Sequence, residues 1–279
     1  MIIGPDYAQV DGNTPPDFDA FEAAAKAAGS RVGFVILRGA YGTSPDPTVG
    51  RDWHAAKASG RQVGAFLFLR MVDSQPPEEQ VHVLADNVGA LRADDLPPII
   101  DIEDTGFTAQ AELAWIHRAW VKVREIFGVS PMLYTSERVW SEDLHSLPAG
   151  EMIDSPLWVA KPWPLEVHRP ADLGRAQPAP LIPKPWGAGN AWLHQYQGDA
   201  YPCPGFSHTV DLSRFLLMRP GETGARVGWV QRRLGTTVNW AYDQTMLEAV
   251  KGFQSLHGLA ADGVIGPQTF TRLCWTSLR

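Results

Sequence analysis

The stretch Pro97-Pro98-Ile99-Ile100-Asp101-Ile102-Glu103-Asp104 decides the fold prediction for this chain. Its two prolines end whatever precedes them, and the β-branched isoleucines that follow predict a short buried strand. Because side chains alternate along a strand, Asp101 and Glu103 project to the same side, roughly 6.6 Å apart. Burying two like charges side by side costs free energy and raises one of the two pKa values. Perturbed carboxylates gather at active sites, so the pair is a candidate for acid–base chemistry; a solvated loop starting at these acids is the alternative.

Outward from this stretch, apolar runs alternate with helical patterns. Apolar residues recur at helical spacing in residues 17–28, 47–59, 77–91 and 109–127. Eight short runs predict strands at residues 2–6, 34–37, 63–69, 99–103, 132–135, 157–160, 192–196 and 209–212. Strands alternating with helices indicate a parallel sheet, and eight strands indicate a closed barrel. Prolines crowd residues 163–191, so the later helices are short or missing. The predicted fold class is α/β, an irregular (β/α) TIM-like barrel.

Acidic and aromatic residues fall where the chemistry of such barrels lies, at the carboxyl ends of the strands. Asp6 follows the first strand, Asp101 and Glu103 belong to the fourth, and Asp211 belongs to the eighth. The aromatic residues near the same ends are Phe66, Phe68, Tyr134, Trp158, Trp163, Trp192 and Tyr196. A single aromatic residue is more often part of the core than a ligand platform. A cluster of acids rimmed by aromatic rings, however, is typical of carbohydrate sites, because sugar rings stack on aromatic faces.

Length and composition set the outer limits. A chain of 279 residues predicts one large and one small domain. Its 44% hydrophobic content and 20% charged residues indicate a folded core and argue against disorder. The N-terminus shows no secretory signal, and no apolar run approaches the roughly 20 residues of a membrane span. Cys203 and Cys274 lie far apart in the sequence and are expected to be free thiols.

The net charge of −7 is unevenly distributed. From residue 221 onward six basic residues face four acidic ones, a surplus of two, which leaves −9 for the first 220 residues. An acidic body lacks the basic footprint that phosphate backbones need, so nucleic acid is excluded as an expected partner.

The ordered motifs of the first 215 residues resemble the N-acetylmuramidase lysozymes of glycoside hydrolase family 25. The most specific matches are the Asp101-Ile102-Glu103 strand and the closing Val210-Asp211 pair. The other matching pieces are Gly4-Pro5-Asp6, residues 34–37, 55–60, 64–68, Tyr134-Thr135, 157–160 and Gln195-Tyr196. The chain departs from the family pattern at residues 7–9 and on its third strand, where Phe66-Leu67-Phe68 replaces a tyrosine-histidine-phenylalanine sequence.

This resemblance implies cleavage of the β-1,4 bond between N-acetylmuramic acid and N-acetylglucosamine in bacterial cell walls. A glycosidase needs a proton donor, and Glu103 takes that role, with a pKa expected to be raised by Asp101. The resemblance also implies that the substrate's acetamide oxygen attacks the anomeric carbon while Asp101 stabilises the oxazolinium. Asp6 and Asp211 would hold the network and the sugar. The substrate would contact Phe66, Phe68, Tyr134, Trp158, Trp192 and Tyr196, and no metal or cofactor is expected.

The end of the chain resembles the small helical peptidoglycan-binding domain of wall hydrolases. Val227, Val230, Gln231 and Leu234 match its first helix, and Phe253-Gln254, Asp262-Gly263 and Gly266-Pro267 match its second half. The predicted organisation is a catalytic barrel in residues 1–218, a linker in 219–225 and a binding domain in 226–279. Because Pro220 and the glycines mark the boundary, few contacts are expected to cross it, and deleting residues 219–279 is expected to leave a folded barrel.

Three other functions remain open from the residues alone. Asp104-Thr105-Gly106 matches one half of an aspartic-protease signature, and a zinc amidase or other wall peptidase would also carry a wall-binding domain. A non-catalytic wall-binding protein with a degenerate barrel is the third. The missing signal together with the wall-binding domain suggests a phage endolysin, made in the host cytoplasm and acting on peptidoglycan after release; a bacterial enzyme with a non-classical export route is the alternative. The protein is expected to be a monomer.

Overall fold

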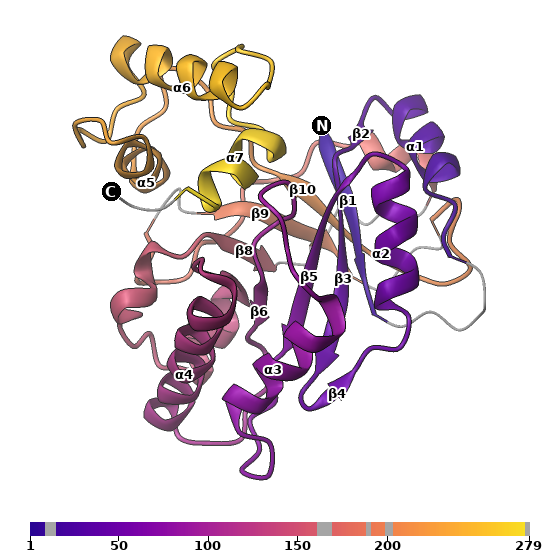
Figure 1. Cartoon of the computed structure of the whole chain (residues 1–279), viewed down its shortest axis with the longest axis vertical. Helices are drawn as coiled ribbons and strands as arrows, with labels where there is room; N and C mark the ends of the chain where they lie inside the picture. Colours follow the sequence, from indigo (N-terminus) through magenta and orange to yellow (C-terminus); the bar gives the residue numbers. More distant parts are fainter. Residues whose placement is uncertain (9–14, 161–168, 188–190, 199–202, 277–279) are drawn as a thin grey trace.

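The computed structural model of the chain describes residues 1–8, 15–160, 169–187, 191–198 and 203–276. A barrel with surrounding helices makes up most of the molecule, and three C-terminal helices cover one of its ends (Figure 1). The N-terminus lies at the covered end.

Eight strands close into the barrel, which confirms the predicted fold class. They are β1 (Ile2–Tyr7), β3 (Phe34–Tyr41), β5 (Gln62–Phe68), β6 (Ile99–Asp101), β7 (Met132–Ser136), β8 (Leu157–Ala160), β9 (Ala191–Gln197) and β10 (Asp211–Phe215). The sheet closes because β1 pairs with β10 on one side and with β3 on the other. Two short strands add to the barrel: β2 (Arg31–Val32) pairs with β1, and β4 (Ser44–Pro45) pairs with β3.

The last strand runs against the others, so the expectation of a wholly parallel sheet is wrong at β10. It pairs antiparallel with both β1 and β9, whereas the other barrel pairs are parallel. A parallel return would need a crossover that usually contains a helix, and the described part of the connection from β9 to β10 contains none. The reversal places the first residue of β10, Asp211, directly opposite Asp6 on β1.

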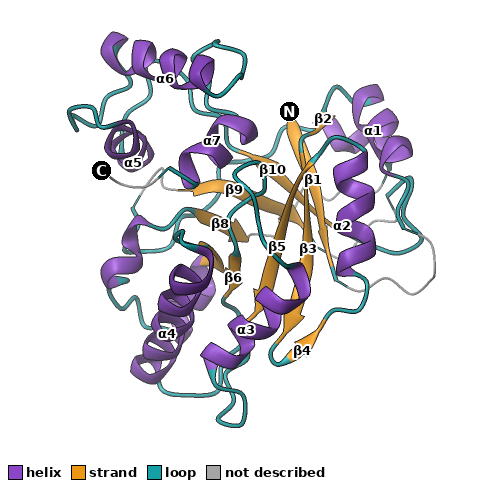
Figure 2. Ribbon diagram, viewed as in Figure 1, coloured by secondary structure: helices purple, strands orange, loops and turns teal. Residues whose placement is uncertain are grey.

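The four predicted helices pack around the first half of the barrel (Figure 2). They are α1 (Phe18–Ala27), α2 (Val49–Ala58), α3 (Pro77–Val88) and α4 (Ala109–Phe127). Side chains cap two of them: the Asp17 carboxylate accepts from the amides of Asp19 and Ala20, and the Thr108 hydroxyl accepts from that of Ala111. Gly128 ends α4 in the left-handed conformation, with φ of 73°.

Between β7 and β10 the described residues contain no α-helix, as the prolines predict. Short π- and 3-10 turns replace it: η1 (Val139–Asp143), η2 (Gly150–Asp154) and η3 (Pro170–Gly174). Trp163, an aromatic residue expected near the strand ends, lies outside the described residues.

The C-terminal helices α5 (Ala225–Leu234), α6 (Gln244–Leu256) and α7 (Pro267–Cys274) pack on the amino ends of the barrel strands. Trp192 at the start of β9 lies with its ring centroid 4.6 Å from that of Phe270 and 5.3 Å from that of Trp229. Phe215 at the end of β10 lies 5.6 Å from Phe270. These rings belong to one buried cluster that runs from the barrel interior into the three helices.

Polar bonds fix the same boundary. The Trp229 indole donates to the Asp154 carbonyl at 2.9 Å, and the Trp275 indole donates to the Asp95 carbonyl at 2.8 Å. The Arg226 guanidinium donates to the Leu216 carbonyl at 2.6 Å. The expectation that few contacts cross this boundary is therefore wrong, because large aromatic side chains of both parts fill one core. The exact domain limits remain a prediction.

Cys203 and Cys274 are both buried free thiols, as expected, and burial raises the pKa of each to about 12. No helix in the described ranges combines the length and the apolar character that a membrane crossing requires.

Candidate active site

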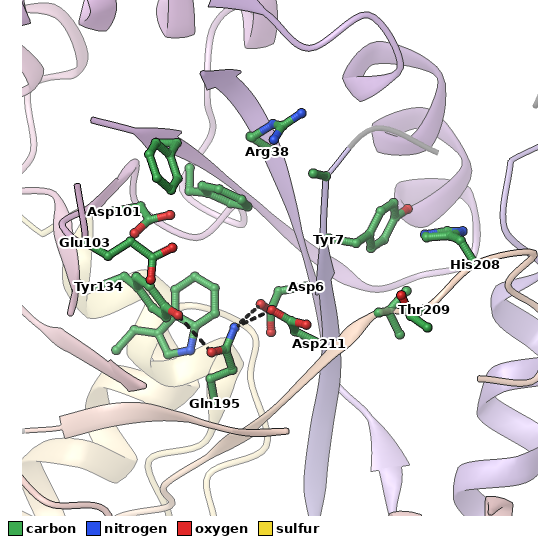
Figure 3. A pocket seen from close by; sticks show the side chains of 15 residues that line it. Asp6, Tyr7, Arg38, Asp101, Glu103, Tyr134, Gln195, His208, Thr209 and Asp211 are labelled. Carbon is green, nitrogen blue, oxygen red and sulfur yellow. Dashed lines mark hydrogen bonds between the residues drawn. The ribbon is translucent and has the colours of Figure 1, made fainter. Parts of the chain in front are cut away.

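Four acidic residues line one cavity of about 460 Å³ at the barrel end opposite the C-terminal helices. Asp6 comes from β1, Asp101 from the end of β6, Glu103 from the segment just after it, and Asp211 from the start of β10. Three sequence positions about 100 residues apart therefore meet in space (Figure 3). The strand alternation that placed Asp101 and Glu103 on one side holds here, since both face the cavity.

The amide of Gln195 on β9 ties two of these acids together. Its Nε2 donates to Asp6 Oδ1 at 2.7 Å and to Asp211 Oδ2 at 2.9 Å, and its Oε1 accepts from the Tyr134 hydroxyl at 2.8 Å (Figure 3). In the sequence Gln195 stands out only as part of a matching motif, because a glutamine in a strand carries no signal of its own. Its contacts make it a positioning residue for the acids.

Asp6 is held from both sides. Its second oxygen accepts from the Ser213 hydroxyl at 2.9 Å, and that hydroxyl accepts from the Trp158 indole at 2.9 Å. Burial raises the pKa of Asp6 well above its usual value, and the charge of Asp211 adds to the rise. The two bonds from Gln195 and Ser213 oppose it by favouring the charged form.

Asp101 is buried with less support. Its Oδ1 has no hydrogen-bond partner among the described residues. Burial raises its pKa well above the usual value, and the charges of Glu103, Asp6 and Asp211 raise it further, while Arg38 lowers it. Asp101 therefore holds its proton at pH values at which an exposed aspartate is charged.

Glu103 is more open to solvent than the other acids, with its carboxyl group reaching into the cavity. Burial of that carboxyl group raises the pKa of Glu103, and the charge of Arg138 lowers it. The expected cause, the charge of Asp101, does not contribute to this rise. The effect runs the other way, because Glu103 raises the pKa of Asp101.

Four of the six predicted aromatic contacts lie at the cavity: Phe66, Phe68, Tyr134 and Trp158. Tyr134 and Trp158 pack with ring centroids 4.5 Å apart and form part of its floor. Leu67, between the two phenylalanines, is fully buried on the opposite face of β5 among the residues that pack under the helices. The departure at Leu67 therefore removes no polar group from the cavity itself.

The other two predicted contacts need correction. Trp192 is fully buried at the far end of the barrel against Phe270 and Trp229. Tyr196 is 1% exposed and packs in the cluster that contains Phe21 and Leu212. Neither ring lines the cavity, since Trp192 lies at the other end of the barrel and Tyr196 packs on the side of the sheet that α1 covers, so neither can stack on a ligand there.

Arg38 is a lining residue that the sequence prediction missed. It follows directly after the predicted strand 34–37, and its Nε lies 3.3 Å from Asp46 Oδ2. Among the lining residues that the structure describes it is the one arginine or lysine, so it supplies positive charge to an otherwise acidic cavity. A charged residue at the end of a buried strand was the available signal.

Two alternative chemistries find no support in the geometry. Asp104, the acid of the protease-like triplet, accepts from Arg70 Nε at 2.6 Å and from the Met71 amide at 3.0 Å, so its carboxylate anchors a loop. In the described part of the chain no three histidine, cysteine or acidic residues cluster in a way that could hold a metal ion.

Comparison with known families gives two matches on this chain. The profile of the glycosyl hydrolases family 25 matches residues 10–199, and that of a putative peptidoglycan binding domain matches residues 223–273. A search of curated proteins found no match.

Solved structures share the fold. A bacterial lysozyme from Streptomyces coelicolor is 21% identical over 77% of this chain and 91% of its own, with a TM-score of 0.60. A family 25 lysozyme from Aspergillus fumigatus is 22% identical, covering 77% of this chain and 93% of its own, with a TM-score of 0.59. The catalytic domain of endolysin ply40, from bacteriophage P40 of Listeria monocytogenes, is 17% identical over 77% and 93%, with a TM-score of 0.53.

Proposed function

The chain belongs to the glycosyl hydrolases family 25, and from this premise we propose that it cleaves the β-1,4 bond between N-acetylmuramic acid and N-acetylglucosamine. Membership of the family together with the peptidoglycan-binding domain makes it a glycoside hydrolase that acts on peptidoglycan. The bond that is cut and the residues that cut it are the proposal.

One observation carries the assignment of residues: Asp6, Asp101, Glu103 and Asp211 share a single cavity floored by aromatic rings. Glu103 is the proposed general acid, because its pKa is raised and its carboxyl group is accessible to a substrate. It donates its proton to the glycosidic oxygen as that bond breaks.

Asp101 is the proposed group that stabilises the oxazolinium. The acetamide oxygen of the substrate attacks the anomeric carbon. Asp101 accepts a hydrogen bond from the acetamide N–H as the oxazolinium forms. For this role Asp101 has to be charged, and Arg38 is the group that favours its charged form. Asp6 and Asp211, linked through Gln195, hold the sugar in the orientation that this attack needs.

The products of peptidoglycan digestion show which bond is cleaved. Mass spectrometry of the fragments should show reducing N-acetylmuramic acid ends with intact peptides. Reducing N-acetylglucosamine ends, freed peptides or cleaved peptides would instead identify a glucosaminidase, an amidase or a peptidase.

The route has its own test. A thiazoline analogue of N-acetylmuramic acid should inhibit, since it resembles the oxazolinium. A glycosyl ester on Asp101 in a quenched reaction would contradict substrate assistance, and inversion at the anomeric carbon, read by NMR, would require an activated water instead.

We further infer that the protein is a phage endolysin and that it acts as a monomer. The combination of a wall-degrading barrel and a wall-binding domain in one chain supports the first of these inferences.

A further inference from the structure

A polar groove runs along the seam between the barrel and the C-terminal helices. Two cavities of about 290 and 580 Å³ form it, and both are lined by Arg31, Asp262, Val264 and Gly266. The barrel supplies one wall through β2 and the start of β5, and the loop before α7 supplies the other. The contact between the walls is close, since a Cβ placed on Gly33 would lie 3.6 Å from the Pro267 ring.

The wall formed by the C-terminal part is held rigidly from below. Gln254 is 1% exposed, and its Nε2 donates to Asp262 Oδ1 and the Val264 carbonyl, both at 3.0 Å. Its Oε1 accepts from the Gly263 amide at 2.9 Å. The loop therefore keeps its shape without a ligand, as expected of a preformed site.

On the barrel wall a polar atom is left without a partner. Gln62, the first residue of β5, is 9% exposed and lines the smaller cavity, and its Oε1 is buried with no hydrogen bond in the described chain. An unsatisfied buried amide oxygen costs about 1–3 kcal/mol. Rotation of the Gln62 side chain toward the cavity would let a ligand N–H remove that cost.

The same groove holds positive charge as well as the carboxylate of Asp262, whose Oδ1 already accepts from Gln254 and from the Val264 amide. The Arg31 guanidinium is exposed and has no acidic partner in the part of the chain that the structure describes. Gly266 caps α7 without a side chain, so the first amides of the helix have no side-chain cap, and Gln268 and Thr269 of that first turn line the cavity. A helix N-terminus and an arginine together bind a carboxylate well.

We propose that this groove binds the peptide portion of peptidoglycan, with the C-terminal carboxylate of the stem peptide between Arg31 and the N-terminus of α7 and a peptide N–H on Gln62. The inference rests on the proposed function for the choice of polymer. Peptide is favoured over glycan because the lactyl carboxyl group of the intact glycan is bonded to the peptide, which leaves the free carboxylates on the peptide. Since the two walls belong to different parts of the chain, the site exists only when they are packed together.

Titration of the full chain with a synthetic stem tetrapeptide tests this, because the peptide has no glycosidic bond to be cut. Calorimetry should show binding that Arg31→Ala weakens at least about tenfold, the usual effect of losing a charged hydrogen bond. Gln62→Leu should weaken it by a smaller factor. Arg175→Ala, which removes an exposed arginine outside the groove, should leave it unchanged.

The peptide carries a second control. The same peptide with its C-terminus amidated should bind the wild-type chain as weakly as the free-acid peptide binds Arg31→Ala. The affinity of the amidated peptide should not change in Arg31→Ala. Equal binding of acid and amide, unchanged binding in Arg31→Ala, no peptide binding at all, or displacement of the peptide by an N-acetylglucosamine tetramer would each overturn the proposal.

Hydrolysis separates the two proposals. Arg31→Ala and Gln62→Leu should cut soluble, peptide-free glycan strands at the wild-type rate, because the groove lies at the other end of the barrel from the acids. A wild-type chain that binds peptide but cuts no glycan would refute the proposed function and leave the groove standing; the reverse result would refute the groove alone.

Discussion

Asp101 keeps a buried carboxyl group in a place where one of its oxygens bonds to nothing in the described chain. Three other acids surround it, and burial is the largest cause of its raised pKa. Such an arrangement weakens the fold and is retained where chemistry requires it. The residue should therefore show opposite effects on stability and on activity.

Asp101→Asn should raise the free energy of unfolding at neutral pH by about 1 kcal/mol or more, a Tm increase of roughly 2–4 °C, and should lower turnover strongly. The folded protein binds the Asp101 proton more tightly than the unfolded chain does. Stability from this group is therefore complete below the ordinary carboxyl pKa of about 3.9 and is lost as pH rises through the raised folded value.

Thermal melts across pH check this prediction, since the gain from the asparagine should shrink towards zero near pH 4. Asp6→Asn is the matched control, because Asp6 is equally buried but accepts two hydrogen bonds and should gain little or lose stability. A destabilised Asp101→Asn at neutral pH would show that the charge is better solvated than its burial implies.

Glu103→Gln keeps the shape of the side chain and removes the transferable proton. Because general acid catalysis contributes about 10²–10⁴-fold, wall clearing should fall at least about a hundredfold with an unchanged circular dichroism spectrum. The raised pKa of Glu103 should also set the alkaline limit of wild-type activity above that of an ordinary glutamate, and the variant should lose this limit. Glu151→Gln, an exposed glutamate remote from the cavity, should behave as wild type; near-normal clearing by Glu103→Gln would remove this residue from the mechanism.

At this scale the acids could be predicted from the sequence and their partners could not. Asp101 and Glu103 follow from strand alternation, which is local. Gln195 positions Asp6 and Asp211 through hydrogen bonds to residues about 190 and 16 positions away from it in the chain. Such long-range partners cannot be found from a local pattern. The prediction that Trp192 and Tyr196 contact the substrate is wrong, because whether a strand residue faces a ligand or a neighbouring helix depends on what packs beyond the strand. The pattern of the strand itself does not contain that information.

Among the elements, the eight strands and four helices of the barrel could be predicted because their apolar periods are regular. The direction of β10 could not, because a strand pattern is the same read either way. Its reversal is what brings Asp211 beside Asp6, so the site depends on a feature that no local pattern encodes.

Helix α7 illustrates how an element can belong to two parts at once. Phe270 is fully buried and touches the rings of Trp192, Phe215 and Trp229. Phe270→Ala should cost about 3–5 kcal/mol and lower a single melting transition shared by the barrel and the helices. Leu256→Ala on α6, at a residue 81% exposed, should leave Tm unchanged. Two separate transitions in calorimetry, with only the smaller one shifted, would mean that the parts melt independently.

For the whole molecule, the packed seam reverses the expectation for a truncated chain. A fragment of residues 1–218 would expose Trp192 and Phe215 to water at the amino end of the barrel. It should be insoluble, or should melt at least about 10 °C below the full chain, because several large buried rings lose their partners at once. Size-exclusion chromatography and thermal melts of the fragment measure this directly. A soluble fragment that melts like the full chain would show that the barrel needs no cover at this end.

The seam also fixes how far the enzyme can reach. Domains on a flexible tether sample many separations, so a held polymer can be cut almost anywhere nearby. Here the acids and the C-terminal helices occupy opposite ends of one body, with the length of the barrel between them. A wall polymer bound by the C-terminal helices is therefore cut at a distance set by the length of the barrel, and not anywhere within the reach of a tether. On this geometry the protein acts as a spacer of set length between the part of the wall that the C-terminal helices hold and the bond that the acids cut.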